Sequence, residues 1–262
     1  MNEIKSIASL QNPLIKKLVR LKEKSRERKQ LGEFVIEGQQ EITLATNAGY
    51  ELIEVILCPE IADSWVAKKF NVPTTHVTKE LYEKIAYRGS TEGVLAIAKA
   101  QDHALTTLVL DKNPLILVAE APEKPGNIGA LLRTADAAKL DAVIIANPKT
   151  DLYNPNIIRS SVGCVFTSPI ATATNQEIIN FLHDHQIKIY CAALTASRIY
   201  STVNYTEPSA IVVGTEATGL SDAWLANSDQ NIIIPMQGQV DSLNVSVSAA
   251  ILIFEAKRQR DL

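Results

Sequence analysis

The stretch IPMQGQVDSLNVSVSAAI, residues 234–251, decides how the C-terminal half of this 262-residue chain is interpreted. Glycine, serine, asparagine and aspartate residues interrupt an apolar run here, and small side chains let another backbone segment or a ligand come close. Ser246 and Ser248 alternate with valines as in a strand, but residues 249–253 continue with helical spacing. We therefore expect a ligand-contacting loop followed by a helix.

Apolar runs that read as buried strands precede this stretch. They are LILVAE, DAVIIAN, KIYCAAL and AIVVGTE, at residues 115–120, 141–147, 188–194 and 210–216. Helical segments separate several of them, which predicts an α/β domain. Polar and small residues follow Leu194, Val213 and Ile234. Because open α/β sheets bind ligands at the carboxyl ends of their strands, we expect a pocket for a flat heterocycle there.

The expected ligand is an adenosine without a pyrophosphate. Neither G-x-G-x-x-G after the first strand nor G-x-x-x-x-G-K-[ST] occurs in the chain. The missing glycine-rich fingerprint also disfavours a nucleotide-dependent oxidoreductase.

A loop and a helix are expected directly after the run at residues 115–120. Pro125 and Gly126 indicate the loop, and Asn127 is predicted to cap the helix that follows. Arg133 falls in the second turn of that helix among alanines and leucines, which favours close packing over a surface arginine with a buried stem.

The N-terminal part is predicted to be a separate small α/β domain. Short apolar runs alternate with helical stretches over residues 33–99, and a polar stretch lies around residues 101–103. The expected domains are residues 1–105 and 106–262.

Residues 1–30 are strongly basic, although the whole chain has a formal charge of −3. They contain nine Lys or Arg against three Glu, and Leu14, Leu18 and Leu21 recur at helical spacing. A basic helix face can be merely solvated or can contact the phosphates of a nucleic acid. The predicted nucleic-acid-binding residues are Lys16, Arg20, Arg26, Arg88 and Arg159, with a simple turn as the equal alternative around Arg88.

Composition excludes several classes of protein. No apolar run approaches the roughly 20 residues of a membrane span, and the first residues lack the apolar centre of a signal peptide, so a cytoplasmic protein is expected. The three cysteines are far apart and form no C-x-x-C pair, which favours buried free thiols. No metal site is expected.

Four motifs resemble those of a known family in their order and gaps. They are PGNIGALLRTADA, RSSVGCVFTSPI, IVVGTEATGLS and IIIPMQGQVDSLNVSVSAAILIFEAKRQ. Residues 114–260 resemble the SpoU (TrmH-type) RNA 2′-O-ribose methyltransferases of the SPOUT superfamily. The preceding residues resemble the ribosomal-protein-like substrate-binding domain found in many members.

The resemblance implies a fold, a cofactor and a partner. The fold is an α/β domain with a deep C-terminal trefoil knot, an exception to the rule that chains stay unknotted. The cofactor is S-adenosylmethionine, and members act as homodimers whose active sites use both subunits. The catalytic positions carried over are Asn127, Arg133, Glu216, Ser242 and Asn244. The cofactor-binding positions are Thr195, Gly214, Glu216, Gly219, Ile234, Met236, Leu243 and Asn244.

The implied reaction is methyl transfer to a ribose 2′-hydroxyl, with ribosomal RNA as the expected substrate. A guanidinium has a pKa above about 12, so we expect Arg133 to bind a phosphate and stabilise developing negative charge, not to act as a base. The proton would leave to a phosphate oxygen, water or Glu216. The alternatives are the same activity on tRNA and a non-catalytic RNA- or ribosome-binding protein.

Overall fold

The computed structural model describes residues 5–63, 70, 72–87, 92–195, 197–215, 218–239 and 241–261. The chain divides into two compact units. The first comprises residues 1–101 and 151–167, and the second comprises residues 102–150 and 168–262. Within the described residues, no helix is long and apolar enough to cross a membrane.

The second unit is built on a parallel sheet of seven strands. These are β6 (Leu115–Glu120), β7 (Ala142–Ala146), β8 (Ile170–Ala173), β9 (Lys188–Ala192), β10 (Arg198–Ile199), β11 (Ser209–Val213) and β12 (Gln230–Ile233). Their order is β10-β12-β9-β11-β6-β7-β8, and every neighbouring pair is parallel. Every residue of β6, β7 and β11 is buried, as expected for central strands covered on both faces.

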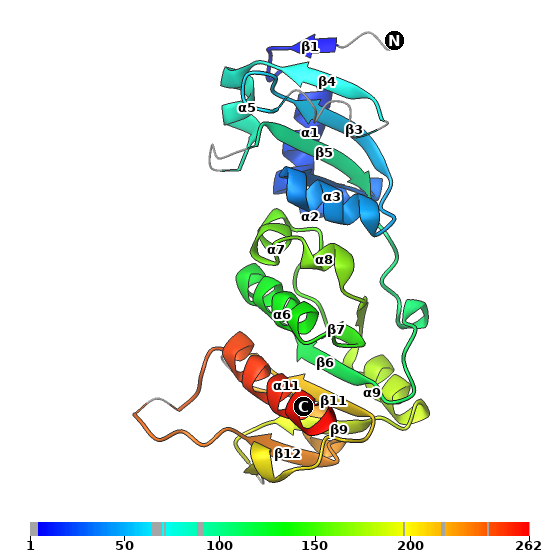
Figure 1. The fold of residues 1–262 in the computed structure, drawn as a ribbon, viewed down its shortest axis with the longest axis vertical. Helices are drawn as coiled ribbons and strands as arrows, with labels where there is room; N and C mark the ends of the chain where they lie inside the picture. Colours follow the sequence, from blue (N-terminus) through cyan, green and yellow to red (C-terminus); the bar gives the residue numbers. More distant parts are fainter. Residues whose placement is uncertain are drawn as a thin grey trace. The chain divides into compact units, whose positions relative to one another are not determined.

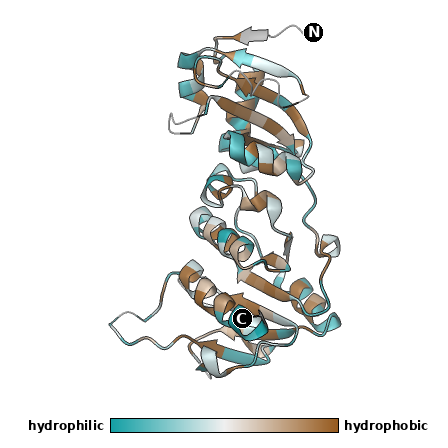
Figure 2. Cartoon of the chain, in the orientation of Figure 1, coloured by the Kyte–Doolittle hydropathy of each residue, from teal (hydrophilic) through white to brown (hydrophobic). Residues whose placement is uncertain are grey.

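The helices of the second unit cover the sheet. They are α6 (Pro125–Ala137), α9 (Asn175–Asp184), α10 (Asp222–Ala226) and α11 (Val245–Asp261), with 3-10 turns η1 (Leu105–Thr107) and η2 (Tyr200–Thr202). α11 packs against α6 and β11, whereas α9 packs against β7, β9 and α10. Figure 2 shows the brown apolar strands between them. Trp224 of α10 is fully buried in the core cluster with Ile144 and Val212.

The strand order reverses in the middle of this sheet. The chain runs outward from β6 through β7 to β8, then returns so that β9 and β11 lie on the other side of β6. Because all strands are parallel, the carboxyl ends of β9, β11 and β12 lie at one edge. Figure 1 shows the orange connection from β12 to the red helix α11 leaving the sheet as a long irregular loop.

The first unit is a mixed five-stranded sheet with helices. Its strands are β1 (Lys5–Ile7), β2 (Glu33–Glu37), β3 (Leu52–Leu57), β4 (Thr74–Val77) and β5 (Val94–Lys99), in the order β1-β4-β3-β5-β2. Its helices are α1 (Pro13–Glu23), α2 (Ser25–Leu31), α3 (Gln39–Asn47), α5 (Lys79–Ile85), α7 (Pro155–Ser160) and α8 (Cys164–Thr167). The predicted alternation over residues 33–99 is confirmed where the chain is described.

Residues 151–167 belong to the first unit because they share its core and an ion pair. Tyr153 stacks on Phe34 with ring centroids 4.0 Å apart. The Arg28 guanidinium donates to both oxygens of Asp151, at 2.8 and 2.7 Å. The predicted domain boundary between residues 105 and 106 remains a prediction for the two functional regions. The two compact units do not follow this boundary, because residues 151–167 pack with the first unit.

The basic N-terminal segment is helical as predicted, but its charges are not all on one outer face. Asn12 caps α1, Pro13 begins it, and Leu18 and Leu21 are fully buried. Arg28 is only 5% exposed because it pairs with Asp151. Burying a guanidinium requires such a partner.

Two smaller predictions are wrong. Asn127 does not cap α6, because the helix already begins at Pro125, whose fixed φ suits the first helical position. Cys58 and Cys191 are buried free thiols, but Cys164 is only partly buried at the start of α8.

Candidate active site

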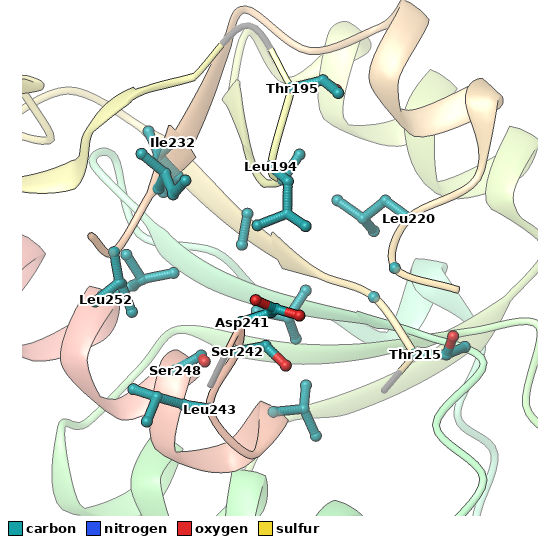
Figure 3. Close-up of a pocket in the computed structure, with 18 of the residues that line it drawn as sticks. Leu194, Thr195, Thr215, Leu220, Ile232, Asp241, Ser242, Leu243, Ser248 and Leu252 are labelled. Atoms are coloured by element: carbon teal, nitrogen blue, oxygen red, sulfur yellow. The ribbon is translucent and has the colours of Figure 1, made fainter. Parts of the chain in front are cut away.

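The carboxyl ends of β9, β11 and β12 and the start of α11 surround one cavity of about 440 Å³. Its walls are mainly apolar, with Leu194, Leu220, Leu243 and Leu252 among them. Figure 3 shows the Asp241 carboxylate and the Ser242 hydroxyl among the lining side chains. The pocket expected at three strand ends is therefore present as a single cavity.

Most of the predicted cofactor-binding positions line this cavity. They are Thr195, Gly214, Gly219, Ile234, Met236 and Leu243, and the predicted catalytic residue Ser242 lines it too. Glu216 lies outside the described residues. The lining also includes residues that the sequence analysis did not select: Thr215, Leu220, Asp241, Ser248 and Leu252.

Gly214 allows the loop after β11 to fold back closely on itself at the cavity. A Cβ added at this position would lie far inside contact distance of the Gly219 carbonyl and 2.5 Å from the Leu220 nitrogen. Thr215 and Gly219 exchange backbone hydrogen bonds of 3.1 Å in both directions, and Gly219 has a φ of +70°. The sequence therefore requires glycine at both positions, for space at Gly214 and for backbone conformation at Gly219.

A buried carboxylate at the end of β6 fixes the same loop. Glu120 Oε2 accepts the Ser221 backbone N–H at 2.8 Å, and Oε1 accepts the Ser221 hydroxyl at 2.6 Å. The Asn175 amide donates to Oε1 at 2.5 Å. Ser221 directly follows the cavity residue Leu220, so Glu120 holds one wall of the cavity in place. The sequence signal for this role is a glutamate that ends an otherwise apolar strand run.

Two predicted catalytic asparagines lie together beside the cavity. The Asn244 side-chain amide donates to Asn127 Oδ1 at 3.2 Å. Asn244 Oδ1 accepts from the Ser246 backbone N–H and hydroxyl, at 2.9 and 2.6 Å, at the start of α11. Asn244 therefore joins the first turn of α11 to the first turn of α6, although neither asparagine lines the cavity.

The structure does not bring the predicted catalytic arginine to the cavity within one chain. Arg133 is exposed on α6 and is absent from the cavity lining. The predicted RNA-binding residues Lys16, Arg20, Arg26 and Arg159 are exposed in the first unit, and Arg88 lies outside the described residues. Among the residues that the structure describes, no three His, Cys, Asp or Glu side chains are placed to hold a metal ion.

The fold and the cavity together define a class of protein. A parallel α/β sheet with a largely apolar pocket at its carboxyl edge, beside a reversal of strand order, is typical of proteins that bind nucleoside-containing ligands. Residues 114–254 match the model of the SpoU rRNA Methylase family, and residues 12–96 match the MRM3-like substrate binding domain. The chain belongs to the SpoU rRNA methylase family.

Relatives and solved structures agree with this assignment over nearly the whole chain. The chain is 31% identical to the 23S rRNA (guanosine-2′-O-)-methyltransferase RlmB of Haemophilus influenzae, covering 83% of this chain and 94% of the relative. It is 28% identical to the 23S rRNA (guanosine(2553)-2′-O)-methyltransferase RlmP of Bacillus subtilis, over 97% of this chain and 100% of the relative. A crystal structure of an RNA 2′-O ribose methyltransferase matches with 39% identity and a TM-score of 0.86, over 98% and 100% of the two chains. The AdoMet-bound rRNA methyltransferase of Sinorhizobium meliloti matches with 26% identity and a TM-score of 0.90, over 97% and 98%.

Proposed function

We propose that this protein transfers a methyl group from S-adenosylmethionine to a ribose 2′-hydroxyl of ribosomal RNA. The observation that carries this proposal is the single cavity lined by Gly214 after β11, Ile234 after β12 and Leu243 just before α11. The named activities of the relatives support it, since those with 23S rRNA in their names are 2′-O-methyltransferases.

The cavity fits the proposed cofactor in size and chemistry. Its volume of about 440 Å³ falls in the range of roughly 300–1,000 Å³ typical of small-molecule sites. Leu220 and Leu243 provide apolar walls for an adenine, and the loop backbones offer N–H and C=O groups to its polar edge. The Asp241 carboxylate provides negative charge for a ligand that carries a sulfonium and an ammonium group.

S-adenosylmethionine supplies an electrophilic methyl group when bound. The residues of the chain then have to align the ribose hydroxyl with that methyl, and holding reactants about 3–3.5 Å apart lowers the barrier substantially. Arg133 binds the neighbouring phosphate and stabilises the developing negative oxygen. Asn127, Ser242 and Asn244 position the groups around it. The proton leaves to a phosphate oxygen, water or Glu216.

Each active site is proposed to use two subunits of a homodimer. Arg133 is exposed and away from the cavity of its own chain, so a partner chain can present it there. Val247 and Phe254, seven residues apart on α11, are each 47% exposed, which is an apolar surface that a partner would cover.

A trefoil knot is proposed for the segment that ends in α11. β11 follows β9 in the chain but lies between β9 and β6, and the segment after β12 approaches the loop around Gly214 before α11 packs on β11.

The first unit is proposed to bind the RNA, in the cytoplasm. It contains the region matching a substrate-binding domain and the exposed basic residues Lys16, Arg20, Arg26 and Arg159. Basic side chains that neutralise phosphates supply the salt-dependent part of RNA affinity.

Calorimetric titration with S-adenosylmethionine and methyl incorporation into purified ribosomal RNA test the proposal. We expect saturable binding at one site per chain and incorporation at ribose 2′-oxygens. Cofactor binding with methyl incorporation into tRNA, and none into ribosomal RNA, would show that the substrate is tRNA. The absence of both binding heat and methyl incorporation would support the alternative of a non-catalytic RNA-binding protein.

Arg133→Lys tests the role of the guanidinium. A phosphate-binding role predicts that the variant has lower turnover with an unchanged alkaline limb of the pH profile. Near-wild-type turnover with an alkaline limb shifted to lower pH would show that Arg133 acts as a base instead.

A further inference from the structure

The first unit contains a second cavity, separate from the proposed cofactor site. Its volume is about 350 Å³, and Glu37 at the end of β2, Tyr87 after α5 and Arg159 of α7 line it. Lys22, Glu41 and Glu92 complete its polar lining. The reaction proposed above uses none of its carboxylates.

The carboxylate of Glu37 is held in a fixed orientation at this cavity. The Tyr87 backbone N–H donates to both oxygens, at 3.0 and 2.8 Å, and the Lys22 ammonium lies 3.9 Å away. Burial raises the pKa of Glu37, and the Tyr87 N–H and the positive charge of Lys22 partly offset this effect. A carboxylate has about four acceptor positions, so Glu37 can accept further hydrogen bonds from a ligand.

The aromatic ring of Tyr87 is also held in place, and the guanidinium of Arg159 lies over it. The Arg159 guanidinium carbon lies 4.8 Å from the ring centroid. The Tyr87 hydroxyl donates to Asn156 Oδ1 at 2.6 Å. The exposed Arg159 therefore presents a supported planar group, and unpaired RNA bases stack on such guanidinium planes and on aromatic rings.

We propose that this cavity binds one unstacked guanine base of the RNA substrate. The inference rests on the proposed function and names a feature of the RNA that the first unit reads. A phosphate is a poor occupant, because the cavity presents the carboxylates of Glu37, Glu41 and Glu92 against the cations of Lys22 and Arg159.

Guanine is the base whose edges match these groups. Its N1–H and N2–H₂ form two adjacent donors, which one carboxylate such as Glu37 accepts side by side. Its O6 and N7 are acceptors for arginine or lysine. Uracil offers a single N–H between two carbonyls, and adenine and cytosine each offer one exocyclic amine beside an acceptor. Charge-assisted hydrogen bonds of the carboxylate to guanine are therefore the most complementary pairing.

Nucleoside titrations with the full chain test the proposal. Guanosine, adenosine, cytidine, uridine and inorganic phosphate are titrated separately by calorimetry and ligand-observed NMR, with excess S-adenosylhomocysteine present to occupy the cofactor cavity. Guanosine is expected to bind on the order of 10-fold more tightly than the other nucleosides. Equal binding of all nucleosides, or preferred binding of phosphate, would overturn the proposal.

Variants assign the binding to the cavity. Glu37→Gln and Arg159→Ala are each expected to weaken guanosine binding on the order of 10-fold. Glu51→Gln is the matched control, because Glu51 is an exposed carboxylate of the same unit outside the cavity. Guanosine binding that survives both variants would contradict the assignment.

Two further measurements separate this inference from the proposed function. Thermal unfolding checks that each variant is folded, and titration with S-adenosylmethionine in the absence of S-adenosylhomocysteine is expected to give the wild-type affinity. Normal cofactor binding and methyl transfer without a guanosine preference would refute the guanine site alone. Absent cofactor binding in the wild-type chain would refute the proposed function.

Discussion

Glu120 is a single buried residue on which the shape of the proposed cofactor cavity depends. Its carboxylate accepts three hydrogen bonds from Ser221 and Asn175, which join the end of β6 to the loop that contains Leu220. A buried acceptor that is replaced by a donor leaves its partners unsatisfied, and that costs more than the net value of one hydrogen bond.

Glu120→Gln is expected to lower the free energy of unfolding by about 2 kcal/mol and to weaken S-adenosylmethionine binding several-fold. The amide NH₂ would face a group that already donates, so the loop would shift. Chemical denaturation and calorimetry measure the two effects. Glu123→Gln, at an exposed position three residues away, is the control and should change neither. Unchanged cofactor affinity in a destabilised Glu120→Gln would show a purely structural role.

The burial of the His103 side chain leads us to expect that the stability of the fold depends on pH. Burial lowers the pKa of His103 from the ordinary 6.5, and a hydrogen bond to the Ile170 carbonyl opposes this only in part. The unfolded chain therefore binds a proton at a higher pH than the folded chain does. Stability from the neutral imidazole is complete above pH 6.5 and falls as the pH drops through 6.5 towards the lowered pKa.

Unfolding temperatures between pH 8 and pH 5 check this expectation. His103→Gln should show a flatter decline than the wild type over the acidic part of that range, on the order of one proton less in the linkage slope. His183→Gln, at an exposed position of α9, should keep the wild-type profile. Parallel profiles for His103→Gln and the wild type would exclude His103 as the titrating group.

At the scale of secondary-structure elements, the loop after β11 folds back on itself, and Gly214 provides the space for Gly219 and Leu220 to lie against it. Gly214→Ala is expected to reduce S-adenosylmethionine binding by at least about 10-fold, because the new methyl group would displace the backbone at Gly219 and Leu220. Gly238→Ala is the matched control, since a Cβ there meets nothing within 4 Å. Equal cofactor affinity in both variants would show that the cavity does not depend on this close approach.

The sequence predicted the long central strands of the second unit and missed several shorter elements, among them the strands β8 and β10. Continuous apolar runs indicated β6, β7, β9 and β11, because strands buried on both faces need apolar side chains throughout. The two-residue strand β10 has exposed side chains and is present because it pairs with β12. Pairing of that kind leaves no periodic signal in the sequence.

At the scale of the whole molecule, the proposed shared active site predicts complementation between two inactive variants. Arg133→Ala and Gly214→Ala are each expected to have little activity as homodimers when S-adenosylmethionine is held near the wild-type Kd. After subunit exchange, a mixed dimer has one site with both defects and one site with neither, so an equal mixture should recover about one quarter of wild-type activity. Native mass spectrometry checks that mixed dimers form. Mixed dimers without activity would place Arg133 and the cofactor cavity on the same chain.

The sequence alone determined the α/β class of the second unit, the three strand ends that form the cavity, and the family. These properties depend on local order along the chain, in apolar runs and in motifs of fixed spacing. Only the tertiary structure decided that residues 151–167 pack with the first unit, that Glu120 holds Ser221, and that Glu37, Tyr87 and Arg159 line a second cavity. The physical reason is that each of these contacts joins residues more than 40 positions apart. Packing and desolvation pair such residues, and neither is encoded in local periodicity.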